Sequence, residues 1–417
     1  MPQTAGARSL VSIDEAIDMV LAATRPLGAE EAPLLDALGR ALARGIVAAE
    51  DIPPFANSAM DGVALRGADL QAGVRRFVLV DEIAAGRVST VALAEGQAAK
   101  IMTGAPLPQG ADTVVPVELT EQAGATVSLR DTVAPAANVR HAGEDVRRGE
   151  AVFTAGQVLG PAEIGLLASL GFERVPVARR PRVAILATGS ELVRPGEPLA
   201  PGKIRNSNSP AAYGQVLGAG GEPVLLGIAR DDPGETRGLL ERALREDVVI
   251  TSGGVSVGEF DFVKAVQDEL GVERRFWGVK TKPGKPVAFG VHGDTLVFGA
   301  PGNPVAAMVA FEFYVRPAML AMQGRRDIYR PHLWAEAEED VRRTRDRVEA
   351  RRCRLAQRAG GWSFTTTGPQ GSGILRSMAL ADGLVFVPSG FSGGGPGTRL
   401  MVMLLEGTSS ERPPFPT

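Results

Sequence analysis

The sequence predicts a multidomain protein of α/β plus β architecture, with a three-layer α/β/α domain at its centre. Between residues 183 and 320, short β-branched runs alternate with helical segments, which is typical of a parallel sheet covered by helices on both faces. Residues 49–140 and 328–417 instead carry short alternating strands separated by glycine and proline turns. The chain has 417 residues, more than one hydrophobic core usually serves, so several domains are expected.

The N-terminal part of the chain indicates helices interrupted by a β-rich insert. Residues 12–23 and 31–43 have helical patterns, and helical signals return at 161–170. We therefore expect the two helical parts to form one discontinuous domain, with residues 179–182 (Arg-Arg-Pro-Arg) as a linker. The predicted domains are residues 1–48 together with 141–178, a β-rich insert of 49–140, an α/β domain of 179–327, and a C-terminal β-barrel or sandwich of 328–417.

The α/β region gives the most detailed expectation. Right-handed crossovers fix its winding, and ligands of such folds lie beyond the carboxyl ends of the strands. The expected strands are 183–187, 223–228, 248–251 and 275–279, and the expected helices lie near 210–219, 234–246, 259–270 and 303–320.

Composition excludes several classes of protein. A formal net charge of −3 gives no electrostatic reason to expect a nucleic-acid binder. The single cysteine, Cys353, excludes an internal disulfide and suits a reducing cytosol, and one cysteine with three histidines is too few for a zinc site. Residues 12–15 (Ser-Ile-Asp-Glu) are a capping box that opens a helix and not a signal peptide. The apolar run 305–320 contains Glu312 and Arg316, so we expect a buried helix and no membrane span.

The most informative motif is the segment 248–258, in which a β-branched run stops at small and hydroxylated residues. A buried parallel strand ends in this way when a polar ligand must approach its backbone. Free N–H groups at such a strand tip suit phosphate or another anion, whereas a tight strand-to-helix turn is the structural alternative. The motif predicts anion binding that involves Ser252, Gly253, Gly254 and Ser256.

Acidic residues follow neighbouring strands of the same predicted sheet. Glu191, Asp261 and either Asp231 or Asp232 come just after strand ends, so their carboxylates can converge at one edge. Several hard oxygen ligands beside a phosphate-binding tip are typical of a Mg²⁺ site. Each motif alone has a structural alternative, an N-cap turn for 188–192 and a helix N-terminus for Asp-Asp-Pro. Their recurrence at one sheet edge favours the metal site.

Lysine is scarce, and three of the six lysines lie within residues 280–285. Where arginine is the default cation, this clustering indicates that a compact ammonium group is needed. Lys282 and Lys285 flank Pro-Gly and are expected to hold a phosphate or another oxyanion, with a solvated hairpin turn as the alternative. Pro304 is explained as the first residue of a helix; Pro301 is not, and two prolines can form a rigid pocket wall.

Other catalytic patterns are absent. The sequence has no P-loop, and Gly-x-Gly-x-x-Gly does not follow the first strand of the sheet, which argues against a P-loop NTPase and a dinucleotide site. No Ser/His/Asp arrangement is credible, because the three histidines are expected in turns, loops or a domain junction.

Taken together, eight motifs resemble the molybdopterin molybdenumtransferase family, the bacterial counterparts of the gephyrin E domain. No single motif is specific, but all eight occur in the family's order and span most of the chain. The motifs are residues 57–62 (Asn-Ser-Ala-Met-Asp-Gly), 101–108 (Ile-Met-Thr-Gly-Ala-Pro-Leu-Pro), 142–145 (Ala-Gly-Glu-Asp), 188–192 (Thr-Gly-Ser-Glu-Leu), 230–233 (Arg-Asp-Asp-Pro), 251–258 (Thr-Ser-Gly-Gly-Val-Ser-Val-Gly), 282–286 (Lys-Pro-Gly-Lys-Pro) and 301–304 (Pro-Gly-Asn-Pro).

The resemblance implies an elongated homodimer of four-domain subunits, with a molybdopterin-binding α/β domain as the third. The active site is then expected between this domain and the second domain of the other subunit. The implied reaction takes adenylylated molybdopterin and molybdate, requires Mg²⁺, and yields molybdenum cofactor and AMP. The implied partners are the molybdopterin adenylyltransferase and molybdoenzyme-maturation proteins in the cytoplasm, and neither nucleic acid nor a membrane is expected.

Site residues are carried over from the resemblance motif by motif. Of these, we predict that Glu191, Asp231 and Asp261 ligate or orient Mg²⁺, and that Lys282 and Lys285 hold molybdate or the terminal phosphate. The full set is Asp61, Thr103, Asp145, Glu191, Asp231, Asp261, Lys282, Lys285, Pro301 and Pro304.

The sequence departs from the family pattern at Asn206 and Ser209, where relatives often carry Asp and Arg. An acid and a base are lost together, as a compensated pair would be. Two rival functions stay open: a non-catalytic molybdopterin-binding or scaffold paralogue, and a nucleotide-processing enzyme of the competence-damage type, which shares the α/β domain. The motifs at 60–62 and 102–104, together with the C-terminal β domain, count against the second.

Overall fold

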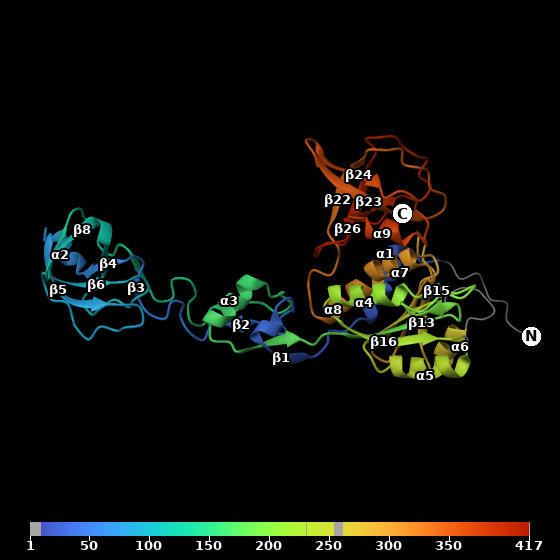
Figure 1. Cartoon of the computed structure of the whole chain (residues 1–417), viewed down its shortest axis with the longest axis horizontal. Helices are drawn as coiled ribbons and strands as arrows, with labels where there is room; N and C mark the ends of the chain where they lie inside the picture. Colours follow the sequence, from blue (N-terminus) through green and yellow to red (C-terminus); the bar gives the residue numbers. More distant parts are fainter. Residues whose placement is uncertain (1–9, 231, 254–261, 417) are drawn as a thin grey trace, which may run out of the picture.

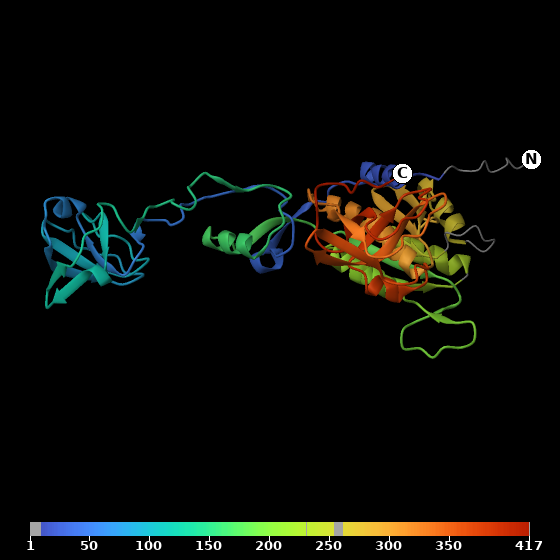
Figure 2. The same cartoon turned by 90° about the horizontal axis from the view of Figure 1, so that it is seen from above.

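The computed structural model describes residues 10–230, 232–253 and 262–416, and it shows an elongated chain with three parts in a row (Figures 1 and 2). A β-rich unit lies at one end, a small mixed unit lies in the middle, and a large body lies at the other end. We call the first two parts together the arm, which extends from residue 29 to residue 178. The body combines a layered α/β structure with a β-barrel, so the predicted fold class is confirmed.

The distal unit of the arm is built on one six-stranded sheet with a short helix, α2 (Gly67–Gln71). Apolar residues alternate on its strands, and those that face inward are buried around Phe77 and Ile101. A two-stranded ribbon of β3 (Asn57–Ser58) and β10 (Val139–Arg140) leads to the middle unit. The strands of the sheet are, in spatial order, β7 (Thr113–Pro116), β4 (Gly62–Leu65), β6 (Gln97–Ile101), β5 (Arg76–Ile83), β9 (Thr126–Leu129) and β8 (Thr120–Ala123).

The middle unit pairs segments that are far apart in sequence. Strand β1 (Ala29–Pro33) pairs with β12 (Arg174–Ala178), and β2 (Ile46–Val47) pairs with β11 (Ala151–Phe153). Helix α3 (Pro161–Ser169) confirms the helix expected at 161–170.

The helix expected at 31–43 is wrong, since this stretch contains β1 and only a short 3-10 helix, Leu34–Ala37. Pro33 begins that turn and Gly39, at a φ of +75°, follows it, so a longer helix is not formed.

The body contains a six-stranded sheet in the order β16-β13-β17-β21-β20-β18. Its first four strands are mutually parallel; β16, β13 and β17 were expected, whereas β21 was not among the expected strands. Strand β20, however, runs antiparallel to both of its neighbours, because a tight hairpin joins it to β21, so the expectation of an all-parallel sheet is wrong at this end. The strands are β13 (Arg182–Thr188), β16 (Glu222–Ala229), β17 (Val248–Ser252), β18 (Glu273–Trp277), β20 (Ala288–His292) and β21 (Thr295–Ala300).

Helices cover both faces of this sheet. Side chains such as Ile185 face α4 (Asn208–Gly218), α7 (Pro304–Ala310) and α8 (Arg316–Met322), whereas Leu186 faces α5 (Pro233–Ala243) and α6 (Phe262–Glu269). The N-terminal helix α1 (Ile13–Ala23) begins at the Ser12–Glu15 capping box and packs on the body, where its apolar face is buried in the largest core (Figure 2). The helix expected at 12–23 is therefore confirmed, although it lies apart from the middle unit.

One helical stretch of the described chain, Pro304–Met322, is long and apolar enough to cross a membrane by length and composition alone. Most of it is buried in the body, and it comprises α7, the π-helical turn Phe311–Val315 and α8. Glu312 is buried within it and is held by Arg330 and Gln215 at 2.8 and 2.9 Å. The prediction of a buried core helix over 305–320 is confirmed.

The C-terminal strands form a closed barrel, because β23 pairs with both β24 and β25. The barrel is joined to the α/β part by β19 (Thr281–Lys282), which lies beside β23 and places Lys282 opposite Glu349. The other elements are β22 (His332–Ala337), β23 (Val348–Arg358), β24 (Gly361–Thr366), α9 (Leu375–Ala379), β25 (Gly383–Val387) and β26 (Arg399–Leu404).

Candidate functional site

A cavity of about 450 Å³ lies at the carboxyl edge of the parallel strands. We call it the cleft. Its position follows from the chain path: after β13 the chain leads to α4 on one face of the sheet, and after β17 it leads toward α6 on the opposite face. Adjacent strands whose connections diverge in this way open a crevice between their tips, where α/β folds bind ligands. The cleft is lined by Thr188, Glu191, Leu192, Ile204, Arg205, Asn206, Ser207, Asn208, Ser252, Gly253, Pro286, Pro301, Gly302, Asn303 and Pro304.

Glycine is required at the tip of β17. Gly253 has a φ of +91°, and a Cβ there would stand 2.7 Å from the carbonyl oxygen of Thr188 on the neighbouring strand. The Gly253 N–H donates to the carbonyl of Ala300 at 3.2 Å, so this amide serves the sheet and is not free for an anion. The remaining predicted residues of this tip, Gly254 and Ser256, lie outside the described residues.

Three acids were predicted to ligate a metal, and the structure describes one of them. Glu191 is exposed at the cleft, while Asp231 and Asp261 lie outside the described residues. Asp232, the alternative to Asp231, is the N-cap of α5 and accepts a hydrogen bond from the Glu235 N–H at 2.7 Å. Among the described residues, no three acids, histidines or cysteines lie close enough together to hold a metal ion. An exposed carboxylate is a suitable hard ligand, so the Mg²⁺ site stays a prediction that rests on Glu191.

The proline pair frames the cleft as expected. Pro301 follows the end of β21, and Pro304 is the first residue of α7. Asn303 occupies the N-cap position, yet its side chain makes no capping hydrogen bond and lines the cleft instead. An asparagine directly before the first helical residue is usually explained as an N-cap, so the sequence alone does not place Asn303 in the cleft.

The departure at Asn206 and Ser209 is a bonded pair. The side-chain amide nitrogen of Asn206 donates to the Ser209 hydroxyl at 2.9 Å, and the Ser209 backbone N–H donates to the side-chain oxygen of Asn206 at 3.1 Å. Both side chains are buried. A neutral pair therefore fixes the start of α4 beside the cleft.

Residues 280–286, which we call the lysine loop, lie between the cleft and the barrel. Pro286 lines the cleft, and Lys285 beside it is exposed. Lys282 turns to the barrel, where its Nζ lies 3.0 Å from a carboxylate oxygen of Glu349 in a second cavity of about 850 Å³. Burial raises the pKa of Glu349, but hydrogen bonds from Lys282 and Arg351 outweigh it and hold the pKa below its usual range. The two lysines are thus neighbours with different surroundings.

One further cation was not foreseen from the sequence. Arg352 on β23 is 1% exposed, and no carboxylate of the described chain lies within ion-pairing distance of it. Its guanidinium donates to the Ser377 hydroxyl and the Gly371 carbonyl, both at 3.0 Å, and burial lowers its pKa to about 10. A buried charge without a counter-charge is costly and often marks a site for an anion.

This buried cation is connected to the cleft. The Ser372 carbonyl, next to Gly371, accepts a hydrogen bond from the Val305 N–H in the first turn of α7 at 3.1 Å. Side chains alternate between the two faces of strand β23, so the sequence suggests that either Arg351 or Arg352 faces inward. It does not show which of the two arginines lacks a carboxylate partner.

The predicted residues of the arm form a separate cluster. The Thr103 N–H and hydroxyl donate to one carboxylate oxygen of Asp61 at 2.7 and 2.8 Å. The bond from the Thr103 backbone and then that from its side chain lower the pKa of Asp61, which stays fully exposed. This cluster adjoins β4 and β6 in the distal unit, at the far end of the chain from the cleft (Figure 1). Asp145 is exposed on the segment that joins the distal and middle units, so one chain does not bring these residues to Glu191.

Family models match three successive stretches of the sequence. Residues 11–171 match the MoeA N-terminal region (domain I and II), residues 184–321 match a probable molybdopterin binding domain, and residues 335–405 match the MoeA C-terminal region (domain IV).

Similar proteins cover nearly the whole chain. Molybdopterin molybdenumtransferase 2 of Mycobacterium tuberculosis is 37% identical over 95% of this chain and 99% of its own length. Molybdopterin molybdenumtransferase of Bacillus subtilis is 36% identical over 97% of both chains. A crystal structure of a molybdopterin biosynthesis MoeA protein from Pyrococcus horikoshii superposes with a TM-score of 0.82 at 31% identity, covering 96% of this chain and all of that one.

Proposed function

The chain belongs to the molybdopterin molybdenumtransferase family, and we propose that it inserts molybdate into adenylylated molybdopterin, releasing AMP and the molybdenum cofactor in a Mg²⁺-dependent reaction. The observation that carries this proposal is the cleft itself: a crevice at the strand ends, bounded by glycine and proline, with Arg205 in its wall and the exposed Lys285 next to Pro286. A pterin with a phosphoanhydride and a small oxyanion are the kinds of ligand such a surface suits.

The cleft supports binding of the larger substrate. Its walls combine the aliphatic side chains of Leu192 and Ile204 with the polar side chains of Asn208 and Asn303. Apolar walls with a few placed polar groups bind and orient a ring system. Glu191 stands at the same cavity, and with Asp231 and Asp261 it would hold Mg²⁺. Bound Mg²⁺ supplies charge neutralisation at the phosphoanhydride.

The cations support binding of molybdate. Lys285 is exposed beside Pro286 at the cleft and can attract a dianion, whereas Arg352 lies buried behind the first turn of α7. Lys282 belongs to the same loop as Lys285 and is held by Glu349. Fixed cations that are already in place when the anion arrives stabilise it without reorganisation, and breaking the phosphoanhydride is mainly a matter of positioning and charge neutralisation.

A homodimer is proposed because one chain keeps the predicted site residues Asp61 and Thr103 apart from Glu191. Asp61 and Thr103 form a fixed, exposed cluster in the arm, and a second subunit would bring this cluster, with Asp145, to the cleft. The middle unit also exposes apolar side chains, including Leu35 at 79% and Leu38 at 52%. Exposed apolar side chains grouped on one small unit are typical of an association surface. We further propose a cytoplasmic enzyme that receives its substrate from the molybdopterin adenylyltransferase and delivers cofactor to molybdoenzyme-maturation proteins.

The test is AMP release. Purified chain is incubated with adenylylated molybdopterin, with and without molybdate and with and without Mg²⁺, and AMP is quantified by chromatography. We expect AMP only when both are present. Binding of the adenylylated substrate without AMP release under any condition would overturn the proposal and favour a non-catalytic molybdopterin carrier.

A further inference from the structure

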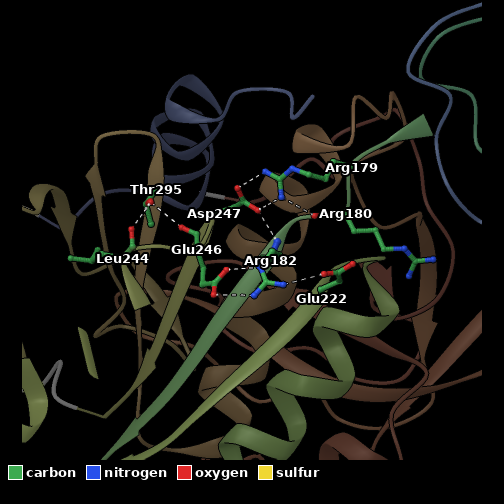
Figure 3. A network of polar contacts seen from close by, with 8 residues as sticks. All are labelled: Arg179, Arg180, Arg182, Glu222, Leu244, Glu246, Asp247 and Thr295. Carbon is green, nitrogen blue, oxygen red and sulfur yellow. Dashed lines mark hydrogen bonds and ion pairs between the residues drawn. The ribbon is translucent and has the colours of Figure 1, made fainter. Parts of the chain in front are cut away.

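Two chain segments join the arm to the body, residues 24–28 and 179–181, and they run side by side. The Arg179 N–H donates to the carbonyl of Gly28 at 2.9 Å. The side chain of Arg179 then reaches Asp247 (Figure 3), which directly precedes β17 and so lies at the amino edge of the central sheet. There its two terminal nitrogens donate to the two carboxylate oxygens of Asp247 at 2.9 and 2.7 Å.

Asp247 is itself held in place by hydrogen bonds to the backbone of neighbouring strands. Its carboxylate also accepts the Arg182 N–H at 2.8 Å, its own N–H donates to the Arg182 carbonyl at 3.1 Å, and its carbonyl accepts the Leu296 N–H at 3.0 Å. Asp247 is therefore tied to the starts of both β13 and β21. A two-bond pair between an arginine and a carboxylate fixes orientation as well as distance.

Other contacts across the connection constrain it less directly. The ion pair of Arg25 and Asp294 has side chains that are 80% and 82% exposed, so water and salt screen it. The Leu27 N–H donates to the Met322 carbonyl at 2.7 Å and Arg325 donates to the Gly39 carbonyl at 2.7 Å, each through a single bond. Of these contacts between described residues, the Arg179–Asp247 contact is the one that has two parallel hydrogen bonds and therefore fixes orientation.

We propose that Arg179 and Asp247 form a positioning clamp that sets the angle between the arm and the body. The inference rests on the proposed function, because the angle matters if Asp61 and Thr103 serve the cleft of a second copy. These residues lie in the distal unit, beside β3 and β4. The distal unit is separated from the body by the whole middle unit (Figures 1 and 2), so a small rotation at the connection moves them a long way. A displacement of about 1 Å at reacting groups can cost roughly a hundredfold in rate.

The chain offers a matched control. Arg182 makes the same kind of two-bond contact with Glu246, at 2.7 and 3.2 Å, and it is similarly exposed. Both of these residues lie within the body (Figure 3). Arg182→Gln thus removes an equivalent ion pair without loosening the connection.

The clamp is tested with spin labels on the full-length chain. Val88 on the distal unit is exposed, and Gly238 on α5 has open space for a side chain, so Val88→Cys and Gly238→Cys are suitable label positions. Cys353 is buried, and its burial raises the pKa of the thiol to about 12, so it does not compete for label. Labelled chain is mixed with an excess of unlabelled chain, and pulsed EPR gives the distance distribution within one chain.

We expect Arg179→Gln to broaden or shift this distribution, while Arg182→Gln leaves it unchanged. Arg179→Gln should also lower kcat/KM for AMP release at least several-fold without a matching fall in the melting temperature. Arg179→Lys should recover part of this loss. An unchanged distance distribution in Arg179→Gln overturns the clamp. A shifted distribution with full activity overturns its role in positioning. If the unaltered chain releases no AMP, the proposed function fails, while the distance measurement still decides whether the clamp exists.

Discussion

The substitution Gly253→Ala tests how tightly the strand tips of the cleft are packed. The glycine has a φ of +91°, and the added Cβ would stand 2.7 Å from the Thr188 carbonyl oxygen and 2.8 Å from the Thr188 hydroxyl. Thr188 ends β13, and its hydroxyl donates to the Ser252 carbonyl at 3.3 Å. The tips of β13 and β17 must therefore separate to admit one methyl group.

The expected destabilisation has two parts. Left-handed backbone costs a non-glycine residue about 1–2 kcal/mol. Forcing an extra methyl group into a close contact typically adds about 1–3 kcal/mol. A substitution at Gly227 on β16 measures the backbone cost alone, because this glycine has a φ of +97° and nothing lies within 4 Å of an added Cβ. Gly227→Ala should carry only the backbone term.

The assay is differential scanning calorimetry of the transition that belongs to the body, since a multidomain chain has no single unfolding free energy. We expect the midpoint of Gly253→Ala to lie below that of Gly227→Ala by roughly 2–10 °C, from the contact term and the usual relation between free energy and midpoint. Equal midpoints for the two variants would refute the close packing of Thr188 on Gly253.

Further predictions concern the barrel and the core. Arg352→Met should raise the KM for molybdate about tenfold or more, because it removes a fixed cation that is proposed to stabilise the dianion. Arg351→Met is the control, since Arg351 is paired with Glu349 at 2.8 Å. An unchanged KM in Arg352→Met would contradict the oxyanion role. Tyr314→Phe should raise the midpoint of the body's transition in chemical denaturation, by the equivalent of about 1 kcal/mol, because the buried Tyr314 hydroxyl has no hydrogen-bond partner among the described residues. A lower midpoint would show that the hydroxyl is satisfied. The pKa of Glu349 is lowered, so its ion pair with Lys282 stabilises the native state above the unfolded pKa of about 4.3 and is lost as pH falls through the native pKa. Glu349→Gln should therefore flatten the decline of melting temperature between neutral and acid pH, and an unaltered decline would count against this pair.

The parts of the fold that follow from local pattern were predictable. The strand expected at 248–251 and the helix expected near 303–320 are both present, because burial on both faces leaves a clear hydrophobic signature. The stretch 31–43 misled because its apolar spacing is helical, whereas its strand is imposed by residues 174–178 far along the chain. The reversed strand β20 was missed for a similar reason, since direction in a sheet depends on the hairpin to β21 and not on composition.

The candidate site was predictable where a motif marks a strand end. Glu191, Ser252, Pro301 and Pro304 meet in one cavity, as expected from the shared edge of a parallel sheet. Arg352 could not be predicted, because its importance lies in its burial without a carboxylate partner among the described residues, and that is a property of the folded environment. The relation of Asp61 to the cleft stays a prediction, since a single chain keeps them apart (Figure 1).

The most direct test of the account is complementation between two inactive variants. Asp61→Asn and Glu191→Gln are each expected to abolish AMP release, and the two chains are then co-expressed and assayed as a mixture. If each site combines Asp61 of one subunit with Glu191 of the other, random pairing makes half of the dimers mixed, each with one intact site, and about a quarter of the native activity returns. If the mixture stays inactive while mixed dimers are present, the site is not shared between subunits and the account is contradicted.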